Sequence, residues 1–86
     1  MGKWEKVRDR VLSGSSDKNI KFDDLCGLLE RMGFDESICG DHHKFRRGDV
    51  EYQPDLQPQR DGKAKRYQVV QVRSMLVNYE LDREEL

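Results

Sequence analysis

Two amphipathic helical segments enclose a stretch of short alternating segments, and this order leaves few folds open to the chain. In residues 23–32 and again in 66–79, apolar residues recur every three or four positions, which predicts a helix in each range. Residues 34–39, 42–47 and 50–57 alternate apolar and polar side chains and are separated by Gly-Asp turns, which predicts three strands. The chain is therefore predicted to be an α+β domain in the order α-β-β-β-α. A meander of three antiparallel strands then has helices on one face and leaves the other face open.

An additional helix is predicted ahead of this domain. Trp4, Val7 and Val11 lie at helical spacing in residues 3–12, and the Ser- and Gly-rich residues 13–17 that follow are typical of a linker. We therefore divide the chain into an N-terminal helix and linker (1–19), a core domain (20–80) and an acidic tail (81–86) that we expect to be frayed.

The helix expected over residues 23–32 carries signals at both ends. Asp23 is expected to cap its first turn, and Gly33 is expected to end it in the left-handed conformation. Gly27 within the helix costs about 1 kcal/mol relative to alanine, a cost that close packing against a neighbour would explain. The third strand contains Pro54, which favours an edge position or a break.

Composition limits both the core and the cellular location. Val, Leu, Ile and Phe make up 20 of the 86 residues, so the core is thin. The sequence contains no apolar run long enough to span a membrane and no secretory signal, and two cysteines in such a chain indicate free thiols in a reducing compartment. We expect a cytoplasmic protein with no membrane contact.

The net charge of −1 does not by itself indicate a nucleic-acid-binding protein, but the charge is unevenly distributed. Residues 40–76 carry a net charge of +3, and residues 77–86 carry −3. A local positive surface attracts phosphate whatever the total charge is. The middle of the chain is therefore the part in which we expect an RNA-binding surface.

The second strand provides a candidate catalytic histidine. Phe45 is its obvious core residue, so alternation places His43 and Phe45 on the buried face and His42, Lys44 and Arg46 on the open one. Cleavage of RNA needs a base for the 2′-hydroxyl and cations for the phosphate, and an exposed imidazole near neutral pH supplies such a base. This function requires that the ring of His42 lie in water with a nitrogen free of partners from its own chain.

Several segments together resemble one known family. Residues 40–45, Gly-Asp-His-His-Lys-Phe, resemble the Gly-Ser-His-x-x-Phe signature of the HicA toxins, also called the YcfA-like family. Residues 22–34, 56–58, 62–65 and 67–73 resemble that family's first helix, the end of its third strand, its basic loop and its last helix, although Arg66 stands where the family often has proline. The resemblance covers about residues 20–80. It implies a double-stranded-RNA-binding-like fold, metal-independent endoribonuclease activity on mRNA, and neutralisation by a HicB-type antitoxin.

The residues expected to carry this function follow from the strand pattern, the basic loop and the resemblance together. His42 is expected to be catalytic, with Asp41 and His43 as possible support, although His43 also fits a purely structural role in the core. The residues expected to bind RNA are cations in two places. Lys44 and Arg46 lie on the second strand. Lys63, Lys65 and Arg66 lie just ahead of the last helix, where they add to the positive end of the helix dipole.

No metal and no cofactor are expected. Cys26 lies within a helix, and the Cys39-x-x-His42 pair lacks a second pair at zinc-ligand spacing. We expect the free chain to be a monomer and to form a hetero-oligomer with its antitoxin. The alternative to a nuclease is a non-catalytic module of the same fold that binds RNA or protein.

Overall fold

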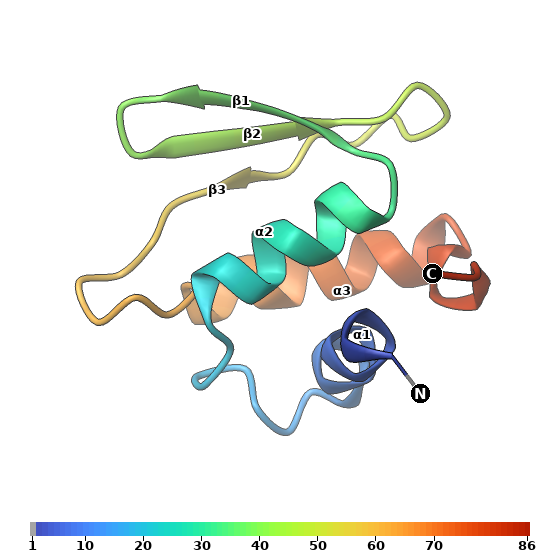
Figure 1. Cartoon of the computed structure of the whole chain (residues 1–86), viewed down its shortest axis with the longest axis horizontal. Coiled ribbons are helices and arrows are strands. Elements are labelled where there is room, and N and C mark those ends of the chain that lie inside the picture. Colours follow the sequence, from blue (N-terminus) through green and yellow to red (C-terminus); the bar gives the residue numbers. More distant parts are fainter. Residues whose placement is uncertain (1) are drawn as a thin grey trace.

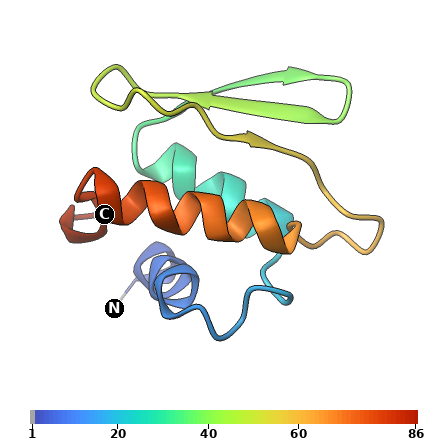
Figure 2. The same ribbon diagram turned by 180° about the vertical axis from the view of Figure 1, so that it is seen from behind.

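A three-stranded antiparallel sheet in the order β1-β2-β3 covers one side of a pair of helices, and a further helix covers the other side. This computed structural model describes residues 2–86. In Figure 1, α2 and α3 lie against one face of the sheet, and α1 packs below them, in contact with both. Figure 2 shows the same three layers from behind. The elements are α1 (Lys3–Ser13), α2 (Phe22–Arg31), β1 (Asp35–Cys39), β2 (His42–Arg46), β3 (Asp55–Leu56), α3 (Arg66–Asn78) and a short 3₁₀ helix η1 (Leu81–Arg83).

The predicted α+β architecture is confirmed, including the additional N-terminal helix and the helices on one face of the sheet. The predicted strand alternation also holds, since Phe45 is fully buried while His42, Lys44 and Arg46 are exposed. The core fills the space between the sheet and the helix pair, where Phe45 and Leu56 meet the apolar faces of α2 and α3. Among residues 2–86, no helix has both the length and the apolar character needed to span a membrane.

The third strand is much shorter than the range 50–57 predicted from the sequence. β3 contains Asp55 and Leu56, and Pro54 lies buried just ahead of it. The Pro54 carbonyl accepts a hydrogen bond from the amide of Phe45 at 2.9 Å. Proline has no N–H with which to continue the ladder, so regular pairing of β3 begins after it.

The start of α2 also differs from the prediction. The N-cap residue is Lys21, and Asp23 lies in the first turn, where its charge still suits the positive end of the helix dipole. The prediction that Asp23 caps this helix is therefore wrong. The predicted end is confirmed: Gly33, with a φ of 92°, terminates the helix in the left-handed region.

Gly27 lets α1 pack closely on α2. A Cβ atom built on Gly27 would overlap the far edge of the Trp4 indole ring. Trp4 is partly buried and packs against the core from α1. The absence of a side chain at Gly27 therefore makes room for the ring, as the sequence suggested.

We predict that Gly27→Ala destabilises the protein although alanine is the better helix former. The gain in helix propensity is about 1 kcal/mol, whereas overpacking typically costs about 1–3 kcal/mol. We expect a net loss of about 1 kcal/mol in urea unfolding, with a shift in tryptophan fluorescence. In the Trp4→Ala background the same change should become stabilising. If it destabilised that background equally, close packing with Trp4 would not be the cause.

The acidic tail is docked, so the expectation that it is frayed is wrong. Leu81 is buried, and the two carboxylate oxygens of Glu84 accept hydrogen bonds from the Arg47 guanidinium at 2.8 and 2.7 Å. Arg8 of α1 donates to the Glu84 carbonyl at 2.6 Å. The tail therefore connects the end of β2 with α1.

We predict that the Arg47–Glu84 pair contributes stability that depends on pH. The hydrogen bond from Arg47 lowers the pKa of Glu84 from its ordinary value of 4.5. A lowered carboxyl pKa stabilises the fold above that ordinary value and ceases to do so as the pH falls through the folded-state value. Because Glu84 is partly exposed, we expect Glu84→Gln to cost about 0.5–1 kcal/mol at pH 7, or about 2–8 °C in Tm. The difference in Tm between Glu84→Gln and the wild type should shrink below pH 4.5. A Tm difference that stays constant down to pH 3 would contradict this prediction.

Candidate active site

His42 is the first residue of β2 and lies on the face of the sheet opposite α2 and α3. The tight β1–β2 turn at Gly40, with a φ of 58°, brings the chain back so that His42 pairs with Cys39. The His42 side chain is 55% exposed. It borders a shallow pocket of about 320 Å³ whose lining comes from all three strands: Ser37, Ile38, Cys39, His42, Lys44 and Asp55.

Both nitrogens of the His42 ring have hydrogen-bond partners on the chain. Nδ1 lies 3.0 Å from a carboxylate oxygen of Asp55, and Nε2 lies 2.9 Å from the amide nitrogen of Gln57. The amide oxygen of Gln57 in turn accepts a hydrogen bond from the Lys65 ammonium at 3.0 Å. One continuous chain of hydrogen bonds therefore runs from Asp55 through His42 and Gln57 to Lys65.

This chain fixes the protonation pattern of the ring. Lys65 can only donate, so the atom of Gln57 that it meets is the amide oxygen, and the NH₂ group of Gln57 faces His42. An amide NH₂ donates, so Nε2 of His42 accepts and Nδ1 carries the hydrogen that is donated to Asp55. Of the two neutral tautomers, this pattern selects the one whose basic lone pair is on Nε2.

A buried glutamine supports this arrangement from below the sheet. Gln68 of α3 is 3% exposed, and its side chain bonds to the backbone on both sides of Leu56. Its amide oxygen accepts from the Gln57 N–H at 3.0 Å, and its amide nitrogen donates to the Asp55 carbonyl at 3.2 Å. The two residues that hold the imidazole are thereby fixed to α3.

The requirement placed on His42 is met in part. The ring is exposed on the open face, as predicted, but the expectation that one of its nitrogens is free is wrong. Asp41, expected to support His42, lies in the exposed β1–β2 turn, and within residues 2–86 the carboxylate bonded to the ring is that of Asp55.

The structure separates the cations that were expected to bind RNA together. Lys44 lines the His42 pocket, and no ion pair involves it in the described part of the chain. Arg46 lies at the far end of β2, opposite Asp35. Lys65 joins the hydrogen-bond chain at His42.

Lys63 and Arg66 lie elsewhere, at the loop between α1 and α2. The Lys63 ammonium donates to the side-chain oxygen of Asn19 at 3.1 Å, and Arg66 borders a small pocket formed with residues 14–19. Lys44 and Lys65 are therefore the cations that the structure brings to His42.

His43 faces the opposite side of β2 from His42. Its Nδ1 lies 2.7 Å from a carboxylate oxygen of Glu36, and its ring meets that of Phe22 edge-on. Because the two histidines lie on different faces of the sheet, His43 cannot contact a substrate bound at His42. Its surroundings fit the structural role that the sequence left open.

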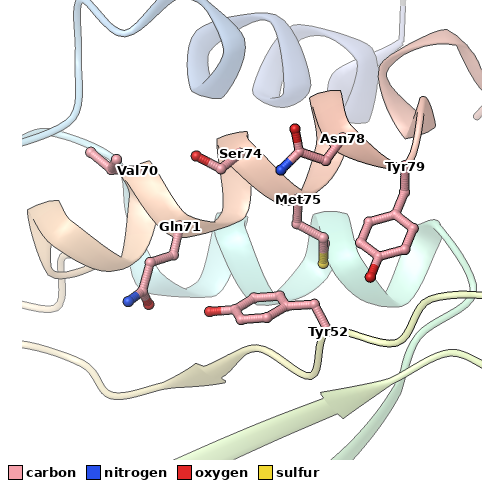
Figure 3. Close-up of a pocket in the computed structure, with 7 residues that line it drawn as sticks. All are labelled: Tyr52, Val70, Gln71, Ser74, Met75, Asn78 and Tyr79. Atoms are coloured by element: carbon pink, nitrogen blue, oxygen red, sulfur yellow. The ribbon is translucent and has the colours of Figure 1, made fainter.

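A second pocket lies away from the histidines, between α3 and the connection from β2 to β3. Figure 3 shows Tyr52 and Tyr79 at its sides, with the polar side chains of Gln71, Ser74 and Asn78 along α3. Its volume is about 420 Å³. Burial and the nearby Asp55 raise the pKa of Tyr52.

Asp55 and Gln57 are the residues at this site that the sequence did not single out. The signal was present, since both flank Leu56, and alternation about a buried leucine places its neighbours on the open face. The pattern does not show how the two-residue strand β3 aligns with β2.

Comparison with known proteins adds nothing to this description, since no family model, no curated protein and no solved structure matches the chain.

Proposed function

We propose that the protein is an endoribonuclease, the toxin of a HicA-type toxin–antitoxin pair, which cleaves mRNA in the cytoplasm and so inhibits translation. The observation that carries the proposal is His42: an exposed imidazole oriented by Asp55, in a pocket that is also lined by Lys44. An oriented base next to a cation is what cleavage by a neighbouring 2′-hydroxyl requires.

The reaction would begin when the substrate takes over the hydrogen bond that Gln57 makes to His42. The ribose 2′-hydroxyl replaces the Gln57 amide at Nε2 of His42 and gives its proton to that nitrogen. The 2′-oxygen attacks the phosphorus, the bond to the 5′-oxygen breaks, and that oxygen takes a proton from the solvent in the open pocket. Asp55 stabilises the imidazolium formed, and Lys44 offsets the charge that develops on the phosphate. The products are a 2′,3′-cyclic phosphate and a 5′-hydroxyl, and no metal ion is required.

The same open face would be the surface covered by a HicB-type antitoxin. A partner seated on β1 and β2 excludes RNA from His42 without altering the fold. In this proposal the chain is a monomer when free and part of a hetero-oligomer when neutralised.

A second function is favoured by one observation, the closed hydrogen-bond chain at His42. If Gln57 is not displaced, His42 serves to hold β2 to β3, and the protein is a non-catalytic module that binds RNA or protein. The difference between the two functions lies in whether an incoming hydroxyl competes with Gln57.

The test is to incubate the purified chain, freed of any partner, with end-labelled single-stranded RNA between pH 6 and 8 in the presence of a chelator. We expect cleavage that leaves 2′,3′-cyclic phosphate ends, because the proposed chemistry uses the 2′-hydroxyl. Binding should weaken with salt, with a slope of log K against log salt of about −0.7 per phosphate contacted. Salt-dependent binding to RNA that stays intact would establish the binding module, and the absence of both would exclude each RNA function.

A further inference from the structure

Three metal-ligating side chains meet between α2 and the sheet, on the opposite side of β2 from His42. Cys26 comes from α2, Glu36 from β1 and His43 from β2, and one donor atom of each lies within 4.8 Å of the other two. The spacing of these residues did not indicate a shared site, since Cys26 lies within a helix and the other two residues are in separate strands.

The donor types and distances fit a zinc ion. Zn²⁺ binds thiolate at about 2.3 Å and imidazole nitrogen or carboxylate oxygen at about 2.0–2.2 Å, in tetrahedral geometry. Those bond lengths place neighbouring ligand atoms about 3.3–3.8 Å apart. Glu36 and His43 lie closer together than this, at 2.7 Å, so binding must move these two side chains apart by about half an ångström. The Cys26 sulfur lies within 4.8 Å of both donor atoms and must approach them by up to about an ångström.

Charge and access favour a cation at this position. The carboxylates of Asp23, Glu30 and Glu36 all lie close enough to act on the Cys26 sulfur, and within the described residues no lysine or arginine pairs with Glu30 or Glu36. The side chains of His43 and Glu36 remain 20% and 19% exposed. An ion can therefore reach the cluster from solvent, and solvent can supply a fourth ligand.

We propose that Cys26, Glu36 and His43 bind one Zn²⁺ ion, with water as the fourth ligand. Binding replaces the thiol proton of Cys26 and the hydrogen bond between Glu36 and His43, and the protons go to solvent. The ion joins α2 to the β1–β2 hairpin and so fixes the strand that begins with His42. This role is structural, and it is independent of whether the open face cleaves RNA.

The test is a Co²⁺ titration of the full chain after removal of bound metal with a chelator. Co²⁺ takes the place of Zn²⁺ in such sites, and a thiolate ligand gives an intense near-ultraviolet band together with the visible bands of tetrahedral cobalt. We expect these bands to saturate at one Co²⁺ per chain and to disappear when Zn²⁺ is added. We also expect Zn²⁺, and not Mg²⁺, to raise the Tm of the wild-type protein.

The chain provides a matched control for two of the ligands. Cys26→Ser and His43→Ala should abolish or strongly weaken the cobalt bands, whereas Cys39→Ser and His42→Ala, changes at an exposed cysteine and at the neighbouring histidine, should leave them intact. Glu36→Gln, which keeps the side-chain shape, should weaken Co²⁺ binding at least tenfold. The proposal is overturned if the wild type shows no thiolate band and no Tm shift with Zn²⁺, or if the bands survive in a folded Cys26→Ser variant or are lost in Cys39→Ser.

Discussion

Replacing His42 with alanine should lower the rate of RNA cleavage by about 10²–10⁴-fold, the usual contribution of a positioned general base. Affinity for RNA should change little, because the cations at the site, Lys44 and Lys65, are retained. The measurement is kcat/KM on a fluorogenic single-stranded RNA, with affinity determined separately on an RNA whose 2′-hydroxyl at the cleavage site is replaced by hydrogen. Induced expression of the variant should also no longer arrest growth.

Two neighbouring changes control for a merely structural effect of His42→Ala. Asp55→Asn removes the charge that favours imidazolium, so we expect an intermediate loss in kcat with little change in KM. Gln57→Ala removes the group that competes with substrate for Nε2, and since one exposed hydrogen bond is worth about 0.5–1.5 kcal/mol, cleavage should rise about 2- to 10-fold. If His42→Ala cleaves RNA as fast as the wild type, His42 is not the base. If Gln57→Ala and His42→Ala lose activity equally, the hydrogen-bond chain supports the fold instead of the chemistry.

Replacing Phe45 with alanine should destabilise the protein by about 3–5 kcal/mol, the range found for buried phenylalanines. Phe45 is fully buried and is the main aromatic anchor of β2 on the helix pair. In a chain with so thin a core, this loss unfolds a large fraction of the molecules. Urea unfolding followed by circular dichroism measures it, and Tyr67→Ala, at an aromatic residue that is 55% exposed, should change stability by no more than about 0.5 kcal/mol. Similar losses in the two variants would mean that the assigned alternation of β2 is wrong.

Much of the fold could be predicted because local pattern and tertiary structure agree. The apolar spacing in residues 23–32 and 66–79 specified both core helices, and one aromatic residue, Phe45, set which side chains of β2 face solvent. The length of β3 could not be predicted, because Pro54 disrupts pairing only where the partner strand presents an acceptor for the N–H that proline lacks. The docking of the tail depends on Arg47, which lies far from Glu84 in sequence, so composition alone indicated a solvated end.

The site could be predicted less completely than the fold. His42 and Lys44 were placed correctly because alternation along a strand is local. Asp55 and Gln57 reach His42 from β3 and the residue after it, and the register that pairs Leu56 with His43 cannot be read from spacing. The division of the basic loop into Lys65 on one side and Lys63 and Arg66 on the other depends on the path of the loop between α1 and α2, which periodicity does not describe.

The position of Gln68 ties the sheet surface to the interior of the molecule. Its single amide holds the backbone of both residues that orient the imidazole, and it stands on the same helix as Val69, Val72 and Leu76, which are fully buried. A change in how α3 sits in the core, even one made far from the strands, is therefore carried to the ring of His42. The orientation of this exposed ring therefore depends on the packing of the interior.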